Sequence, residues 1–168
     1  MINTFDFEYM STKIPHAERV SAWGCFSRSG VGDIDVFTDM LDARMMKAIL
    51  NDHLLQSARR LFPATHWWFL QDNDPKHKSK VVCKWLFTKG VQCIDFPPYS
   101  PDLNPIENLW NDLKRRVEQH NATDIEELER HLRDEWQATS TDFLANLVES
   151  MPSRCKAVIA SEGHLTKY

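Results

Sequence analysis

The segment that decides the fold reads WWFLQDNDP and covers residues 67–75. Its first part is short, apolar and aromatic, a pattern typical of a buried strand. The strand is expected to end at Gln71, because the next four residues, Asp72-Asn73-Asp74-Pro75, favour turns and helix caps over a continuing ladder. The pattern therefore predicts a buried strand that delivers Asp72 at its C-terminal end.

The sequence before this strand predicts a β-hairpin and a helix. Residues 20–28 (VSAWGCFSR) and 33–38 (DIDVFT) are rich in strand-forming residues, and the glycines between them suit a tight turn. From Asp42 to Leu54 apolar residues recur at helical spacing, with Asp42 placed to cap the helix and Pro63 beyond its end.

The sequence after this strand predicts a parallel crossover and then helices. A helix over 81–86 is followed by Gly90, which suits a C-terminal cap, and by a strand over 91–96. Four prolines between 97 and 105 predict a rigid, non-repetitive loop. Helical faces follow, with Thr123 and Glu126 spaced as a capping box; they cover 106–117, 125–136, 143–148 and 155–159. This order is that of an α/β domain with extra C-terminal helices.

The composition excludes several classes of protein. With 168 residues and 42% hydrophobic content, the chain is long enough for one globular domain with a buried core. Its four scattered cysteines predict reduced core thiols and no zinc cluster. No apolar run approaches the roughly 18 residues of a membrane span, and the start does not resemble a signal peptide. We therefore expect a soluble, intracellular protein without a membrane partner.

The charge is unevenly distributed along the chain. A formal net charge of −4 argues against a surface that binds nucleic acid everywhere. Two basic runs stand out, one from Lys76 to Lys84 and one at 114–116, while residues 124–135 are strongly acidic. Taken alone, such runs are more often solvated helix faces than DNA-binding grooves.

Two carboxylates are candidates for chemistry. Asp72 ends a predicted strand, Glu107 opens a helix beyond the proline loop, and 34 residues separate them. Because the strand ends and loops of a parallel α/β sheet share one edge, the two carboxylates can converge there. Such convergence is what divalent metal ions need in order to act on a phosphodiester.

A structural role explains the same residues, and composition and spacing alone favour it. Asn104-Pro105-Ile106-Glu107 has the form of a helix start, with Asn104 as the cap and Glu107 reaching back to the cap amide. Residues 72–75 have the form of a turn followed by a capped helix.

Four strings resemble the catalytic domain of mariner superfamily (Tc/mariner) transposases, in the branch whose third acidic residue is Glu. They occur in the family's order: AWGCFSRSGVG (22–32), QDNDPKHKSK (71–80), PPYSPDLNPIENLW (97–110) and SMPSRCKAVIASEGHLTKY (150–168). The resemblance implies a ribonuclease H-like fold of the DDE integrase and transposase type. It also implies a nuclear enzyme that cuts and integrates DNA with two Mg²⁺ or Mn²⁺ ions, acting on transposon ends and target DNA. A small-molecule substrate is not expected, and a homodimer is compatible with the family.

The resemblance also assigns roles to individual residues. Asp72 matches the second acidic metal ligand and Glu107 the third, so both are predicted to be catalytic. Asp102 matches the proline loop, where a turn role explains it at least as well. Further residues are expected to support the site or contact DNA, namely Asn73, Asp74, Lys76, His77, Lys78 and Asn104.

The chain departs from the family's pattern at its beginning. In the family, the first catalytic aspartate lies on a central strand upstream of the AWGCF string, and a DNA-binding region precedes it. Only 21 residues precede Ala22 here. We therefore expect a catalytic domain over 20–168 that lacks its first strand, after a non-matching segment over 1–19. The sole substitute is TFDFEY (4–9), which alternates like a half-buried strand and offers Asp6 as a first acid.

Two functions are compatible with this sequence. The first is a metal-dependent DNA endonuclease and strand transferase of a cut-and-paste transposon, catalytically incomplete without its first acid. The alternative is a non-catalytic remnant of a transposon gene that binds nucleic acid or another protein. A missing inner strand would also expose unpaired backbone and favour aggregation or association.

Overall fold

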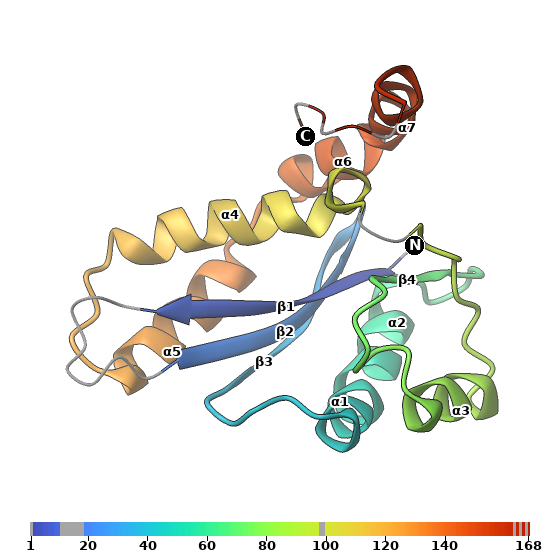
Figure 1. The fold of residues 1–168 in the computed structure, drawn as a ribbon. Coiled ribbons are helices and arrows are strands. Elements are labelled where there is room, and N and C mark those ends of the chain that lie inside the picture. The colour runs from blue at the N-terminus through green and yellow to red at the C-terminus, as the bar shows by residue number, and fades with distance from the viewer. Residues whose placement is uncertain (1, 11–18, 98–99, 163, 165, 167) are drawn as a thin grey trace.

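A four-stranded sheet in the order β3-β2-β1-β4 is the centre of the fold (Figure 1). The structure, a computed structural model, describes the backbone of residues 2–10, 19–97, 100–162, 164, 166 and 168, and side chains from Val20 onward. The strands are β1 (Ile2–Met10), β2 (Arg19–Ser27), β3 (Gly30–Phe37) and β4 (Phe69–Gln71). β1 pairs antiparallel with β2 and parallel with β4, and β2 pairs antiparallel with β3.

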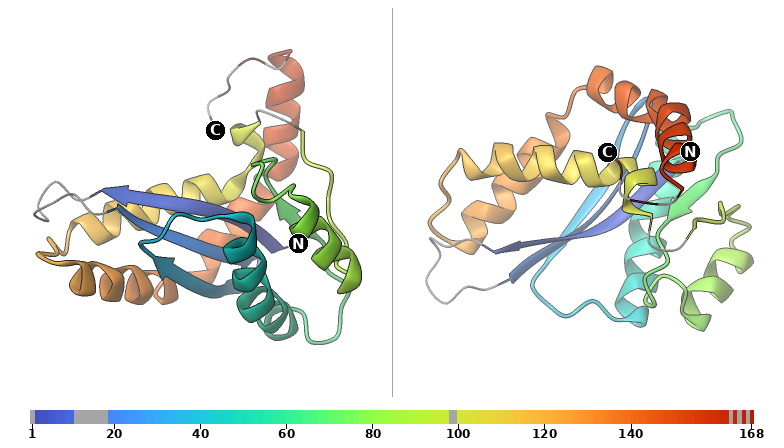
Figure 2. Two further views of the ribbon diagram at one scale, coloured as in Figure 1. Left: turned by 60° about the horizontal axis from the view of Figure 1, so that its bottom comes forward. Right: turned by 45° about the horizontal axis from the view of Figure 1, so that its top comes forward.

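Helices cover both faces of this sheet (Figure 2). One face carries α1 (Ala43–Ile49), the π-helical turn η1 (Leu50–Leu54), α2 (Leu55–Leu61) and α3 (Lys80–Thr88). The other face carries α4 (Pro105–Glu118), α5 (Ile125–Gln137) and α6 (Thr141–Glu149). The last helix, α7 (Met151–Ala160), follows α6 and contacts the loop before α4. In the described chain, no helix is long and apolar enough to cross a membrane.

The alternation of β2 separates the two cores. Val20 and Ala22 are buried among α4, α5 and α6, whereas Trp23 and Cys25 are buried among α1, α2 and α3. Successive side chains of a strand point to opposite faces, so one strand supplies both cores. The predicted hairpin is confirmed, as are the Asp42 cap of α1, the buried strand that ends before Asp72, and the later helices.

The inner strand that we expected to be missing is present. β1 lies between β2 and β4, and its backbone pairs with both. The alternation of residues 4–9 predicts a strand, and backbone pairing with both neighbours gives it this inner position. The expectation of an unfilled sheet was therefore wrong at this position. The predicted division into 1–19 and 20–168 stays a prediction.

Three local predictions need correction. The segment over 91–96 forms only an isolated parallel bridge, between Cys93 and Phe69, with Phe69 N–H donating to Gln92 O at 2.8 Å. The proline loop contains a 3₁₀ turn, η2 (Pro101–Leu103). The cap of α5 is Asp124, and Glu127 accepts from Thr123 N–H at 2.9 Å, so the capping interaction lies one residue later than predicted.

The cysteines are all free, but only Cys25 is a core thiol. Cys83, Cys93 and Cys155 are exposed. Burial raises the pKa of Cys25 to about 12, so this thiol stays protonated at physiological pH.

The outer edge of β3 is occupied by side chains of the neighbouring helices. Asp33 N–H donates to Ser57 Oγ at 2.8 Å, and Gly32 O accepts from Trp136 Nε1 at 2.9 Å. Ile34 O accepts from Arg133 at 3.2 Å. Side chains of α2 and α5 thus bond one backbone group on each of three consecutive residues of this edge strand.

Candidate active site

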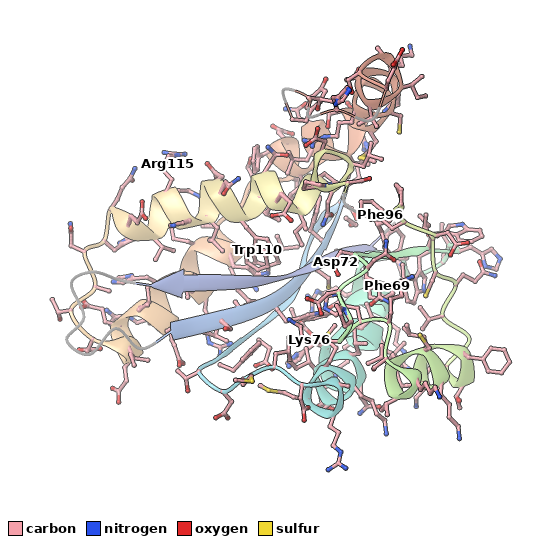
Figure 3. The ribbon with its side chains drawn as sticks, in the orientation of Figure 1. Phe69, Asp72, Lys76, Phe96, Trp110 and Arg115 are labelled. Atoms are coloured by element: carbon pink, nitrogen blue, oxygen red, sulfur yellow. The ribbon has the colours of Figure 1, made fainter. Side chains whose placement is uncertain are left out.

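A cleft of about 460 Å³ opens where β4 ends and α4 begins. Asp72 leaves β4 directly into this cleft, and Glu107 enters it from the first turn of α4. Asn73, Asp74 and Asn104 also line it, together with Pro75, Phe96, Pro97, Ser100 and Pro101. In Figure 3, Asp72 lies between the sheet and the segment that holds Phe96. The two acids predicted to be catalytic therefore share one cavity.

Asp72 is oriented through one of its two carboxylate oxygens. Its Oδ1 accepts from Asp74 N–H at 3.0 Å and pairs with Nδ1 of His77, which is fully buried. Oδ2 has no hydrogen bond within the described chain, so it is available to a ligand in the cleft. The predicted turn role of Asp72 is thus real, but it uses only one oxygen.

The charges around Asp72 favour its ionised form. Burial alone would raise its pKa, but the hydrogen bond and charge of His77, the Asp74 N–H and the nearby Lys76 outweigh burial. The net effect holds the pKa of Asp72 below its usual range.

The carboxylate of Glu107 has no hydrogen bond or ion pair within the described chain. Burial raises its pKa first, and the negative charge of Asp72 raises it further. That influence of Asp72 agrees with the shared cleft. A carboxylate that is half-buried, near a like charge and without a donor is the kind of group that a cation would stabilise.

Asn104 does not cap α4, contrary to the structural interpretation. It occupies the cap position, yet its side chain makes no capping hydrogen bond. The side chain is 2% exposed, and its Oδ1 has no partner within the described chain. A buried acceptor without a donor costs about 1–3 kcal/mol. Glu107 does not reach back to the cap amide either, since Asn104 N–H donates to Pro101 O.

The other predicted residues lie around the cleft in distinct roles. Asn73 donates to Phe96 O at 2.6 Å and joins the end of β4 to the following segment. Asp74 accepts from Lys76 N–H at 2.8 Å and pairs with Lys76 Nζ at 3.3 Å. Lys78 is exposed and does not line the cleft. Asp102 is buried and accepts from Thr166 N–H at 2.7 Å, which is a structural role.

The donors in the cleft suit one hard divalent cation. Carboxylate and carboxamide oxygens are the ligands that Mg²⁺ and Mn²⁺ prefer, and Asp72 Oδ2, Glu107 and the unpartnered Asn104 Oδ1 supply them. A third acid does not join them: no group of three or more His, Cys, Asp and Glu side chains in the described residues could hold a metal ion.

Asp6 is paired away from these donors by the register of β1. Its partner on β2 is Trp23, which is buried on the face covered by α1, α2 and α3. Directly opposed residues share a sheet face, whereas Glu107 belongs to the helix on the other face. The side chain of Asp6 lies outside the described residues, so its role as a first acid stays a prediction that the register does not favour.

One buried residue near the cleft was not singled out in the sequence. Arg154 of α7 is 3% exposed and donates to the proline loop and to α4. Arg154 lies within residues 150–168, the last of the four strings that resemble the family, and that resemblance is the feature of the sequence that could have pointed to it. A lone arginine in a helix otherwise suggests a solvated position.

Comparison with solved structures defines the class of fold. The catalytic domain of the Mos1 mariner transposase matches with a TM-score of 0.88 at 19% identity, over 99% of this chain and 83% of that one. The same domain with raltegravir and Mn matches with a TM-score of 0.87 at 20% identity, over 99% and 84%. The chain therefore has the ribonuclease H-like fold of DDE enzymes.

Sequence comparison then gives the family. A profile described as "DDE superfamily endonuclease" matches residues 9–129. The Tcb1 transposase of Caenorhabditis briggsae is 36% identical over 162 residues, 96% of this chain and 59% of that protein. The Tc1 transposase of Caenorhabditis elegans is 36% identical over 153 residues, 89% and 54%. The chain belongs to the DDE superfamily endonucleases, in the Tc1/mariner group, and spans a little over half the length of these relatives.

Proposed function

We propose that this chain is the catalytic-domain portion of a cut-and-paste DNA transposase and is catalytically incomplete by itself. The observation that carries the proposal is the shared cleft of Asp72 and Glu107, each with carboxylate oxygen not used within the described chain. The relatives named above are transposases, which supports DNA cleavage and strand transfer as the reaction.

In this proposal Asp72 and Glu107 hold Mg²⁺ or Mn²⁺, and Asn104 adds a neutral oxygen. His77 and the Asp74 N–H fix the rotamer of Asp72, so that Oδ2 faces the cleft. A bound ion would activate an attacking oxygen or stabilise a leaving oxygen at a DNA phosphate. Structures of the related Mos1 domain with Mn and with Mg support this choice of metal.

The proposed partner is DNA, both transposon ends and target, and the proposed location is the nucleus. Lys78, Lys80 and Lys84 are exposed and have no ion pair within the described chain. They extend from the segment after Asp72 along α3, where they can contact phosphates. Association into a homodimer is part of this proposal, as is the domain boundary near residue 20.

A non-catalytic role is the second candidate, and one observation favours it. Three described acids line the cleft, but both carboxylate oxygens of Asp74 are engaged by Lys76, which leaves Asp72 and Glu107 where a DDE site is expected to use three acids. In that case the lysines of α3 would bind DNA with moderate salt sensitivity, and neutralising Asp72 would not weaken that binding.

Isothermal titration of Mn²⁺ separates the two functions. The variants are Asp72→Asn and Glu107→Gln, which keep the shape of each side chain and remove its charge, with exposed Asp95→Ala as the control. We expect wild type and the control to bind Mn²⁺ with equal affinity and the two neutral variants to lose binding. A plasmid-nicking assay on the same samples then measures activity.

Each outcome has a distinct meaning. Binding that both neutral variants abolish supports the metal site, and nicking by wild type would show that the site works despite the missing acid. Folded wild-type protein that binds no Mn²⁺ would overturn the metal site and leave the DNA-binding remnant.

A further inference from the structure

A single buried arginine ties together the two ends of the segment that carries Asn104 and Glu107. The Arg154 guanidinium donates to Asp102 O at 3.0 Å and to Asn108 Oδ1 at 2.6 Å. Asp102 lies two residues before Asn104, and Asn108 directly follows Glu107. The span between these anchors is the start of α4 and the wall of the cleft.

Arg154 is itself held by two contacts, and the Asp102 residue that it bonds is held by a third. Its Nε donates to Ser150 Oγ at 2.8 Å, within α7 and the turn before it. The Tyr168 ring lies under the guanidinium, 4.8 Å from its carbon to the ring centroid. The Asp102 carboxylate accepts from Thr166 N–H at 2.7 Å. The C-terminal helix and segment therefore act as the fixed support from which Arg154 reaches the cleft wall.

A buried arginine at position 154 lowers the stability of the fold relative to an apolar side chain. The hydrogen-bond acceptors of the guanidinium are a carbonyl, an amide and a hydroxyl, all neutral groups. Burial lowers the pKa of Arg154, which reflects the cost of keeping a cation out of water. What the planar guanidinium provides in return is a fixed geometry between two separate backbone segments, which a lysine cannot reproduce.

We propose that Arg154 is a positioning residue for the metal site, and that it holds Asn104 and Glu107 in the geometry that faces Asp72. This inference rests on the proposed metal-binding function. It assigns the α7 helix, which lines no part of the cleft, a role in metal affinity through the 102–108 segment.

The test compares Arg154→Met and Arg154→Lys with Arg116→Met. Arg116 is a matched control, because it is a partly buried arginine on α4 that donates to Glu135 O at 2.7 Å, far from Glu107. Removing a group that orients a metal ligand typically weakens metal binding 10–100-fold. We expect about a 10-fold or larger loss of Mn²⁺ affinity in Arg154→Met, partial recovery in Arg154→Lys, and wild-type affinity in Arg116→Met.

A second readout needs no metal and keeps the inference testable in every case. Amide hydrogen exchange in EDTA should accelerate at 103–108 in Arg154→Met, and it should stay slow there in Arg116→Met. Wild-type Mn²⁺ affinity in a folded Arg154→Met protein would overturn the inference, as would equal losses in both Met variants. Wild type that binds no Mn²⁺ overturns the proposed function instead, and unchanged exchange at 103–108 then overturns the positioning role separately.

Discussion

At the scale of single residues, the pKa values of Asp72 and Glu107 are shifted in opposite directions within one cleft. Burial acts to raise the pKa of both carboxyl groups. For Asp72 this effect is outweighed by His77, the Asp74 N–H and Lys76, which lower its pKa. Glu107 has no such compensation, and the charge of Asp72 adds to its burial. The metal-free protein therefore keeps one ionised oxygen ligand ready and one that is unfavourable when ionised.

Glu107→Gln should stabilise the metal-free protein at neutral pH. The folded state disfavours the charged form of Glu107, and the neutral amide removes that destabilisation. Because the folded-state pKa is raised, the destabilisation is full above it and disappears as the pH falls through it towards the ordinary value of 4.5. The advantage of the variant should therefore vanish under acidic conditions.

Thermal unfolding of both proteins in EDTA, between roughly pH 4 and pH 8, measures this difference. An equal or lower Tm for Glu107→Gln near neutral pH would contradict it. Excess Mn²⁺ should reverse the order, since only wild type gains stability by binding the ion.

The sequence predicted that Asp72 and Glu107 converge, but it did not predict the contacts of their neighbours. The string from Asn104 to Glu107 has the spacing of a capping box, and yet neither side chain caps α4. Spacing fixes which residues stand at a helix start, while the direction of each side chain depends on the packing around it. Arg154 supplies part of that packing from 46 residues beyond Asn108, a distance in sequence that no local pattern can report.

At the scale of elements, the spacing of apolar residues predicted the helices and strands that form from local sequence. The hairpin, α1 to α4 and the later helices follow from apolar alternation at strand or helical spacing. The predicted strand over 91–96 is reduced to a single bridge, because the strand that it would pair with, Phe69–Gln71, has only three residues. The cap of α5 was placed one residue early, because Thr123 and Asp124 both suit a cap and the geometry selects Asp124.

The register of β1 identifies the position where a third acid would meet the cleft. Thr4 pairs with Gln71, so one further step sets Phe5 level with Asp72. On the other side Phe5 pairs with Gly24, where an added Cβ would lie 3.0 Å from the Trp110 ring of α4. Both pairings place position 5, and not Asp6, on the face that carries Glu107.

Phe5→Asp should therefore tighten Mn²⁺ binding by about 10-fold or more, because three carboxylates would hold the ion in place of the two proposed here. Titration of Mn²⁺ and plasmid nicking measure the gain, and Asp6→Asn is the control expected to leave affinity unchanged. The substitution removes an aromatic side chain, so circular dichroism must show retained structure. Loss of affinity in Asp6→Asn, with no gain in folded Phe5→Asp, would reverse the assignment.

At the scale of the whole molecule, the two basic runs differ in their partners. Arg115 and Arg116 pair with Asp112, and Arg116 also pairs with Glu135. Arg115 points away from the sheet on α4 (Figure 3). In the described residues, Lys78, Lys80 and Lys84 have no such partners. The first run therefore offers three exposed lysines that have no ion pair within the described residues, whereas Arg115 and Arg116 of the second run are paired.

DNA binding should depend on salt mainly through this first run. Each phosphate contact contributes about 0.9 to the slope of log affinity against log salt. Lys78→Gln and Lys80→Gln should each reduce that slope by roughly 1, and Arg115→Gln should leave it nearly unchanged. Fluorescence anisotropy with a short duplex over a salt series measures the slopes; equal effects of all three substitutions would show that ion pairing on α4 does not decide which cations reach DNA.

The occupied edge of β3 affects how the protein aggregates at high concentration. An unpaired strand edge is a template on which other copies can polymerise into extended sheets. Ser57, Trp136 and Arg133 take the backbone groups of three consecutive residues there. These side-chain contacts, together with the irregular register at Gly32 and Asp33, hinder fibre growth from this end of the sheet, and the protection lasts only while α2 and α5 stay docked.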